Sequence, residues 1–369
     1  MGLTVGFNEQ PNFFDGLSVA NRMTTRKGMT VDATRLDYGQ LLRRLSVPLC
    51  FAASIVIFGI LAPDAFLVPR TLTSILASAA PIVVLTIATV ITLRGGDYDL
   101  SVAAVMTLSS VTIGVLNIKY GMDIGPAIAI AIAVSIVVGL INAFFCIVVG
   151  IDSFIMTLGM STILAGIVLW ISNSNSYSGL SDWLVYLVTN RDILGLPFSF
   201  YVAFVISAIV WVVFEFTPIG RQHRIVGKSR EIAKLNGIAV GRIRTLSFLS
   251  CSVLAAVAGI LYAGAAGGVD PTSALTMLLP AFAAAFLGST TILPGQFNPW
   301  GAFLSVYFLV TGITGLAILG LPTFVQSFFY GGALIIAVSL AQLSKSGGGD
   351  LRRRIMRARR DGEDGPVEN

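Results

Sequence analysis

The sequence predicts an all-α polytopic membrane protein with about ten transmembrane helices and both termini in the cytoplasm. Of its 369 residues, 55% are apolar and only 12% are charged, whereas a soluble domain carries about 25% charged residues. Charge-free runs long enough to cross a hydrocarbon core recur along the chain, and the basic residues gather on one side of them. No soluble fold of this length could bury so much apolar surface, which excludes soluble, disordered and nucleic-acid-binding classes.

The spans are found where charge is absent. Seven charge-free runs precede Asp270, namely Leu45–Pro63, Thr71–Leu93, Leu100–Ile118, Ile124–Ile151, Ser153–Ser181, Ile193–Phe214 and Thr245–Val269. No charged residue follows Asp270 until Lys345, and this stretch is too long for two spans. Gly and Pro cluster at Gly288–Pro299 and Leu319–Pro322, which divides the stretch into three. The resulting spans lie near Ala274–Phe286, Trp300–Ile318 and Thr323–Leu343.

The distribution of Lys and Arg tests this count independently. With a cytoplasmic N-terminus, only Arg70, Lys119 and Arg191 of the 24 basic residues lie outside, as the positive-inside rule requires. Removing one span from the last stretch would move the basic C-terminal segment to the wrong face. The net charge of +5 is therefore read mainly as an orientation signal.

Three regions follow from these boundaries. Residues 1–44 contain no long apolar run, so we expect a cytoplasmic tail without stable structure and no cleaved signal peptide. Residues 45–344 form the transmembrane domain, interrupted by a basic cytoplasmic loop at residues 215–244. Residues 345–369 are first basic and then acidic, which favours contact of this tail with anionic lipid headgroups.

The cytoplasmic loop contains a predicted short helix. Ser229 precedes the sequence REIAKLNG as an N-cap, and Gly237 ends it. Ile232 and Leu235 give this helix a small apolar face, which suits docking into a groove of a partner. The alternative is an ordinary basic loop that lies on its own bundle. The GKS sequence before the helix is no phosphate loop, because Gln222 occupies the position of the first glycine and a span precedes it.

A second cytoplasmic segment, RGGDYDLS, joins the second and third spans. Asp99 and Ser101 can cap the helix that follows, where a carboxylate is favoured by the helix dipole. Ion-coupled transport would need an acidic residue deep within a span, and every Asp and Glu lies in a loop, in a tail or at a span edge. This weakens a secondary carrier, although a sodium site built from backbone groups stays open.

Metal and redox chemistry have few candidate residues. The three cysteines, Cys50, Cys146 and Cys251, lie in apolar runs without a CxxC pair, so buried unpaired thiols are expected. His223 is the single histidine. We therefore expect no metal, no cofactor and no catalytic residue in this chain.

Four stretches, in this order, resemble the permease subunits of bacterial ABC importers of the ribose, xylose and galactose type. The first is GDYDLS at Gly96–Ser101, and the second is SFIMTLGMSTILAG, beginning at Ser153. The third is the cytoplasmic loop, with matching positions Thr217, Gly220, Arg221, Gly227, Ala233, Gly237 and Ile238. The fourth is Gly288–Pro299, where Gly288, Thr290 and Gly295 match. The resemblance covers about residues 44–343.

The resemblance implies a translocation subunit that does no covalent chemistry. ATP would be bound and hydrolysed by a separate ATPase subunit, into which the cytoplasmic loop docks. The residues implied in this coupling are Gly220, Arg221, Gly227, Glu231, Ala233, Gly237 and Ile238. The segment implied at the cytoplasmic mouth of the pathway consists of Gly96, Asp97, Asp99, Leu100 and Ser101.

The resemblance also implies partners and a location. A periplasmic substrate-binding protein would deliver a monosaccharide, and two permease chains, as a homodimer, would cross a bacterial inner membrane together. A non-sugar such as a nucleoside or an autoinducer is the alternative substrate. An ion-coupled secondary carrier is the less favoured alternative mechanism.

Overall fold

The computed structural model describes residues 38–190 and 192–345. The chain divides into two units, Met1–Leu41 and Leu42–Asn369, and the helical bundle belongs to the second. The expected tail at residues 345–369 lies outside the described residues except for Lys345, as does the expected N-terminal tail up to residue 37. Helix α2 begins at Tyr38, ahead of the expected start of the first span.

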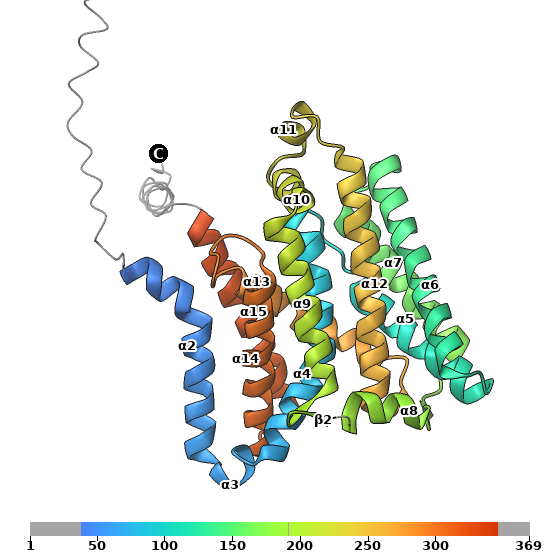
Figure 1. Cartoon of the computed structure of the whole chain (residues 1–369), viewed down its shortest axis with the longest axis vertical. Coiled ribbons are helices and arrows are strands. Elements are labelled where there is room, and N and C mark those ends of the chain that lie inside the picture. The colour runs from blue at the N-terminus through green and yellow to red at the C-terminus, as the bar shows by residue number, and fades with distance from the viewer. Residues whose placement is uncertain (1–37, 191, 346–369) are drawn as a thin grey trace, which may run out of the picture. The chain divides into compact units, whose positions relative to one another are not determined.

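The described part is almost entirely helical (Figure 1). The longer helices run side by side, while the few strands are two-residue pairs, β1 with β4 and β2 with β3. In chain order the elements are α2 (Tyr38–Leu61), α3 (Pro63–Phe66), α4 (Pro69–Arg94), α5 (Val102–Gly114), η1 (Val115–Lys119), α6 (Ile124–Ala143), η2 (Phe144–Val149), α7 (Ser153–Ser172), β1 (Tyr177–Ser178), α8 (Asp182–Val185), η3 (Tyr186–Asn190), β2 (Asp192–Ile193), β3 (Leu196–Pro197), α9 (Phe198–Phe216), α10 (Pro218–Lys228), α11 (Arg230–Leu235), α12 (Val240–Ala266), β4 (Gly268–Val269), η4 (Ser273–Met277), α13 (Leu278–Gly288), α14 (Pro299–Ile318) and α15 (Thr323–Lys345).

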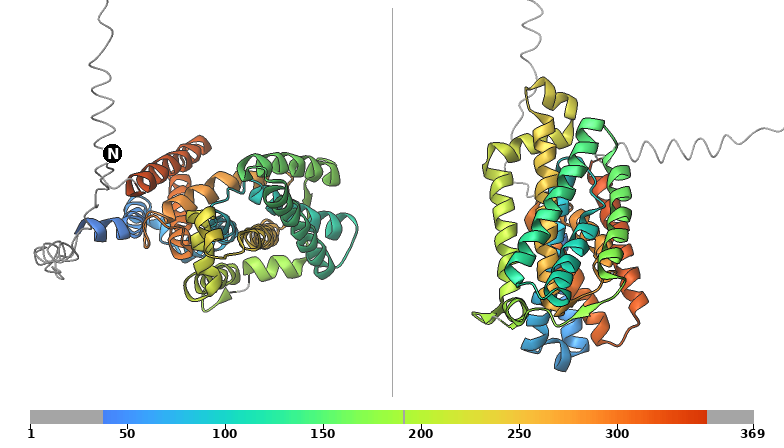
Figure 2. Two further views of the ribbon diagram at one scale, coloured as in Figure 1. Left: turned by 90° about the horizontal axis from the view of Figure 1, so that it is seen from above. Right: turned by 90° about the vertical axis from the view of Figure 1, so that its right-hand side faces the viewer.

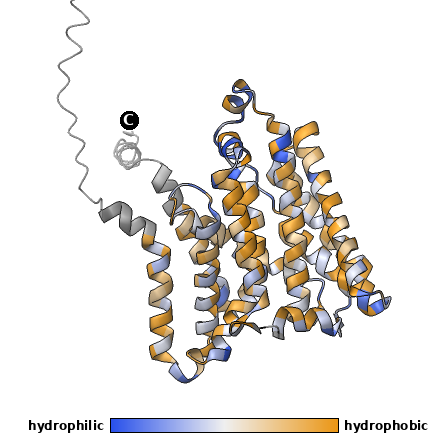
Figure 3. Ribbon diagram, viewed as in Figure 1, coloured by the Kyte–Doolittle hydropathy of each residue, from blue (hydrophilic) through white to orange (hydrophobic). Residues whose placement is uncertain are grey.

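Helices occupy all ten expected spans. Among the described residues, seven are long and apolar enough to cross a membrane: α4, α5 with η1, α6 with η2, α7, α9, α12 and α14. The three remaining apolar stretches are shorter, at Leu45–Leu61, Leu275–Gly288 and Thr323–Ser339. Figure 3 shows hydrophobic residues along most of these helices and hydrophilic residues near α10 and α11. The all-α class is confirmed, whereas length and composition alone identify seven spans.

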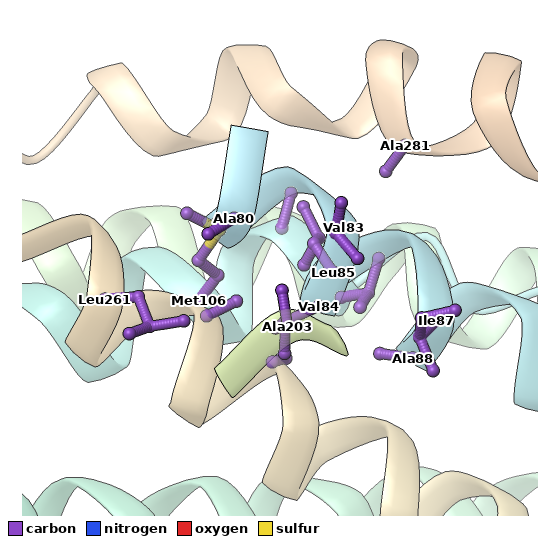
Figure 4. Packing of buried hydrophobic residues seen from close by; sticks show 14 of the residues in the cluster. Ala80, Val83, Val84, Leu85, Ile87, Ala88, Met106, Ala203, Leu261 and Ala281 are labelled. Carbon is purple, nitrogen blue, oxygen red and sulfur yellow. The ribbon is translucent and has the colours of Figure 1, made fainter. Parts of the chain in front are cut away.

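Helix α4 lies at the centre of the bundle and packs against α9, α12, α13 and α14. Its second half is completely enclosed, with Val83, Val84, Leu85 and Ile87 at 0% exposure. Figure 4 shows these side chains meeting small and aliphatic residues of the neighbouring helices. Viewed along the bundle in Figure 2, helices surround α4 on several sides. Such a helix is apolar all round because it faces protein on all sides.

Helix α13 is too short to span a bilayer, and the backbone that follows it is irregular and largely buried. Asn298 organises this Gly288–Pro299 segment: its side-chain amide donates to the carbonyls of Gly288, Thr291 and Gln296 at 3.1–3.3 Å. Its Oδ1 accepts from the Gly301 amide at 2.7 Å and caps α14. These bonds supply partners for backbone carbonyls at the end of α13 and beyond it.

The three cysteines do not share one environment. Cys146 and Cys251 are buried, as expected, but Cys50 is exposed on α2. Its position on a helix face that contacts no neighbour explains the difference, since an apolar run predicts membrane location and not burial within protein.

Candidate functional site

Helix α10 packs closely on the end of α4. Thr217 caps it by accepting a hydrogen bond from the Gly220 amide at 3.3 Å, and Pro218 occupies the first turn. Gly220 and Gly227 lie on the packed side: a Cβ at Gly220 would overlap the Phe214 carbonyl, and one at Gly227 would overlap the Arg94 carbonyl oxygen. Only glycine permits this approach of backbone to backbone. The loop is therefore in direct contact with the α4–α5 connection.

A charged cluster joins the ends of α4 and α9 to α10. Arg94, the last residue of α4, donates to Glu215 Oε1 at 3.0 Å, and Arg224 of α10 donates to Glu215 Oε2 at 2.8 Å. The Arg94 guanidinium also lies 4.2 Å from the centroid of the Phe214 ring. One carboxylate thus holds a guanidinium from each of two helices, and the arginine side chain of α4 is enclosed.

His223 fills the space beneath this cluster. It stacks on Phe214, with 5.4 Å between ring centroids, and its Nε2 lies 2.7 Å from the Ser247 hydroxyl of α12. Burial, and secondarily the nearby Arg94 charge, lower the pKa of His223 to about 4. The imidazole is consequently neutral at physiological pH and packs as a structural group.

Asp97 forms the second charged cluster. Its side chain is 1% exposed and accepts from Arg230 at 2.8 Å and from both Nε and Nη2 of Arg244, at 2.8 and 2.7 Å. Arg230 begins α11 and also donates to the Gly96 carbonyl at 3.1 Å. The α4–α5 connection is thereby bound to the start of α11 and to the first turn of α12.

Asp99 has no basic partner among the described residues. Its Oδ1 accepts from the amide and hydroxyl of Ser101, at 2.9 and 2.6 Å, and Asn142 of α6 donates to the same hydroxyl at 2.8 Å. Burial raises the pKa of the Asp99 carboxyl. The expected side-chain cap of α5 is absent: Ser101 occupies the N-cap position without such a bond, and the Asp99 carboxylate instead accepts from the Ser101 amide.

The start of α7 also binds the α4–α5 connection. Ser153 accepts from the Tyr98 amide at 3.1 Å, and Thr157 accepts from the Leu100 amide at 2.9 Å. Both hydroxyls belong to the SFIMTLGM stretch. Arg94 in turn donates to the Phe297 carbonyl of the Gly288–Pro299 segment at 3.5 Å. The four stretches singled out in the sequence therefore meet at the end of α4.

Helix α11 projects from this assembly at the upper end in Figure 1. Ser229 caps it by accepting from the Ile232 amide at 3.3 Å, and Gly237 follows it with a φ of +73°. Ala233 is completely buried among Val226, Val240 and Ile243, with Ile238 packed beside them. The predicted helix, its cap and its stop are thus all present.

The two faces of α11 differ sharply. Ile232 is 56% exposed and Leu235 is 88% exposed, and Glu231 is also exposed. The segment does pack on its own bundle through α10 and Ala233, as the alternative of an ordinary loop expects. One face fixes α11 to the bundle, while the other presents much of Ile232 and most of Leu235 to the outside.

The structure brings most of the predicted site residues together. Gly220, Gly227, Ala233 and Ile238 lie in the packed interface, Asp97 and Gly96 lie against it, and Asp99, Leu100 and Ser101 lie just behind. Arg221, Glu231 and Gly237 are exposed. Sequence reasoning missed the ion-pair partners Arg94, Glu215, Arg230 and Arg244. In the sequence, only their positions could have indicated them, since each lies at the edge of an apolar run or beside the short helix.

The chain was compared with known proteins. Residues 71–338 match the family described as branched-chain amino acid transport system, permease component. The chain belongs to this permease family. Among its curated relatives is the D-allose transport system permease protein AlsC of Escherichia coli K12, 28% identical over 79% of this chain and 89% of the relative. The ribose import permease protein RbsC of Bacillus subtilis is 27% identical over 85% of this chain and 97% of the relative.

A third relative is the autoinducer 2 import system permease protein LsrD of Photorhabdus laumondii, 28% identical over 66% of this chain and 74% of the relative. No solved structure is significantly similar to the chain. The permease is therefore a multi-pass inner-membrane subunit of an ABC importer of the sugar and autoinducer-2 type. Within the described residues, no group of three or more His, Cys, Asp or Glu side chains could hold a metal ion.

Proposed function

We propose that the permease carries a monosaccharide inward in an importer driven by a separate ATPase subunit, which binds and hydrolyses the ATP. Helices α10 and α11 form the coupling segment on the cytoplasmic side. In this proposal Glu231, Ile232 and Leu235 face the ATPase. Gly220, Gly227, Ala233 and Ile238 fix the segment to the bundle, while the exposed Arg221 and Gly237 shape the entry to the loop and the end of α11. A periplasmic binding protein delivers the substrate to the opposite end.

The observation that carries this proposal is the contrast between the two sides of α11. An apolar helix face that is exposed outside the membrane costs free energy unless a partner covers it. The ion pairs of Asp97 with Arg230 and Arg244 link the same helix to the α4–α5 connection. If the ATPase moves α11, these ion pairs would transmit the movement to Gly96–Ser101. We propose that this segment lines the cytoplasmic end of the translocation pathway.

The proposal includes a topology of ten spans with both termini in the cytoplasm. Two chains form the complete pathway as a homodimer, and the basic C-terminal tail rests on anionic lipid. Neither ATP nor a metal binds to this chain. The ten apolar helices and the one-sided distribution of basic residues support this arrangement.

The substrate class rests on the relatives. Two of them, over 79% and 85% of this chain, carry allose and ribose in their names. The autoinducer-2 relatives favour a second candidate, since their identity to this chain is equally high. A sugar is preferred because the ribose permease matches 85% of the chain, whereas these autoinducer-2 permeases match 66–80% of it.

Transport in proteoliposomes tests the proposal. The permease is reconstituted with the ATPase and binding protein encoded beside its gene, and uptake of labelled D-ribose, D-allose and autoinducer 2 is measured. ATP-dependent uptake of a sugar is expected. Uptake that follows an ion gradient without the ATPase would contradict the proposal, and uptake of autoinducer 2 alone would favour the second candidate.

The coupling assignment has a separate test in Gly237→Pro. Proline fixes φ near −65°, whereas Gly237 has a φ of +73°, so the end of α11 must reorganise. We expect normal membrane insertion but loss of ATPase association in co-purification. Unchanged association and transport would show that α11 is not the coupling element.

A further inference from the structure

A cavity of about 510 Å³ opens near the end of the bundle opposite α11. It lies between α5 with η1, α6 and α7, and none of its lining residues belongs to the candidate site. Pockets that hold small ligands have volumes of roughly 300–1,000 Å³. The cavity is thus large enough for a small molecule and is separate from the coupling segment.

Two exposed aromatic rings line this cavity. Trp170, near the end of α7, is 78% exposed, and Tyr120, directly after η1, is 68% exposed. The Lys119 ammonium lies 5.4 Å from the centroid of the Tyr120 ring. Exposed aromatic rings are also typical of a membrane interface, so the rings by themselves do not identify a ligand.

Three hydrogen-bonding groups distinguish the cavity from an interfacial belt. The Thr112 hydroxyl, the Lys119 ammonium and the Asn173 side-chain amide all line it, and Lys119 and Asn173 are exposed. Other hydroxyls of α5 are satisfied: Thr107 and Ser110 donate to carbonyls at 2.8 and 2.9 Å. Donors and acceptors that converge beside aromatic rings are the chemistry that recognises a neutral polyhydroxylated molecule.

The local backbone supports a binding role. Val115, Leu116 and Lys119 line the cavity from η1, a turn of π-helix that interrupts the end of this span. Such turns re-aim side chains and occur frequently at functional sites. The lining contains no carboxylate, so a cation is not the ligand that this chemistry favours.

We propose that this cavity is the first binding site for the sugar on its way into the membrane. The rings of Trp170 and Tyr120 contact the C–H faces of the sugar, while Thr112, Lys119 and Asn173 bond to its hydroxyl groups. This inference rests on the proposed function, because it takes the imported molecule to be a sugar and this end of the bundle to face the periplasm.

Alkylation of a single cysteine tests the site directly. Thr112→Cys is introduced together with Cys50→Ala, which removes the one exposed native thiol, and the complete transporter is placed in proteoliposomes. A maleimide reagent is then applied with D-ribose, D-allose or a sugar that the transporter does not import. We expect the imported sugar alone to slow labelling by at least about threefold, since an occupied site excludes the reagent in proportion to its occupancy.

A second variant pair measures the contribution of the aromatic ring. Trp170→Leu should lower sugar uptake at least about fivefold, the loss expected for one stacking contact of roughly 1 kcal/mol. Trp183→Leu is the matched control, because this ring lies at the same end, is 59% exposed and does not line the cavity. Its uptake should stay within about twofold of the native value.

The outcomes separate this inference from the proposed function. Sugar uptake without protection of Thr112→Cys, together with equal uptake by the Trp170 and Trp183 variants, would overturn the site and leave the function intact. Protection by the non-imported sugar, or protection that depends only on adding phosphatidylglycerol, would also overturn it and indicate a non-specific or lipid-binding surface. Absence of any sugar uptake would overturn both.

Discussion

Asp97 accepts three hydrogen bonds from two arginines, Arg230 and Arg244, and its side chain is 1% exposed. Its replacement by asparagine would leave Arg244 buried without a counter-charge. We expect Asp97→Asn to lower the free energy of unfolding by about 3–5 kcal/mol, the usual cost of breaking a buried ion pair. Thermal unfolding in detergent measures this, with the exposed Asp64→Asn as control. Equal melting temperatures for the two variants would contradict the assignment.

The lowered pKa of His223 predicts how the stability of the folded protein depends on pH. Its pKa is about 4 in the folded protein and about 6.5 when unfolded, so the unfolded state binds more protons between these values. The contribution of His223 to stability is therefore complete above pH 6.5 and is lost progressively as the pH falls toward 4. We expect the melting temperature of the native protein to fall relative to that of His223→Gln over this window. Because Asp99 shifts in the opposite sense, the difference between the two curves is the measurement, and parallel curves would contradict the prediction.

For single residues, the sequence indicates which side chains matter better than it indicates which side chains contact each other. Asp97 and Asp99 share one short segment, but only the structure distinguishes them, since one meets two arginines and the other meets a hydroxyl. Glu215 and Arg94 lie far apart in the chain, and a single sequence contains no information on which span ends adjoin. Ser229 and Gly237 were predictable because capping depends on neighbours within a few residues.

Helix α11 is the element whose surface carries the clearest prediction. Leu235→Glu places a charge on its exposed apolar face without disturbing the buried Ala233. We expect ATPase co-purification to fall at least about tenfold, while the yield of folded permease is unchanged, because a charge in an apolar interface costs more than 1.4 kcal/mol. Leu194→Glu is a matched control, since Leu194 is 94% exposed at the opposite end. Equal loss in both variants, or in neither, would contradict the role of α11.

At the cytoplasmic loop around α11, the observed helix ends differ from the expected span limits. The charged residues at its edges set the expected limits at 215 and 244, yet α9 continues to Phe216 and α12 already begins at Val240. Glu215 and Arg244 can belong to helices because each has an opposite charge within the protein. The expected span limits assume that every charged side chain lies in water. Glu215 and Arg244 do not fit this assumption, because each forms an ion pair within the protein.

The arrangement of the whole molecule in the membrane can be tested with the same two positions. Leu235→Cys and Leu194→Cys are each introduced with Cys50→Ala. A membrane-impermeant maleimide should label Leu194→Cys in cells with a permeable outer membrane, and Leu235→Cys only in inside-out vesicles. One span, α9, separates Leu194 from Leu235, so the two positions should lie on opposite sides of the membrane. Labelling of both from one side would contradict this topology.

Much of the whole-molecule architecture was predictable from the distribution of charge. The ten apolar runs and the ten apolar helices coincide, because a bilayer constrains both composition and length. What composition could not give was helix length: α13 has only 11 residues, too few to cross a bilayer. The central place of α4 was equally hidden, since burial in protein and contact with lipid demand the same residues.

The brevity of α13 has a consequence for how the chain enters the membrane. A segment of this length cannot partition into lipid alone, and the carbonyl groups after it bond to Asn298, which belongs to the next helix. We therefore expect the two to enter the membrane together, as a hairpin whose turn carries its internal hydrogen bonds. On this expectation, residues up to Gly288 leave the translocation channel only after synthesis has passed Pro299.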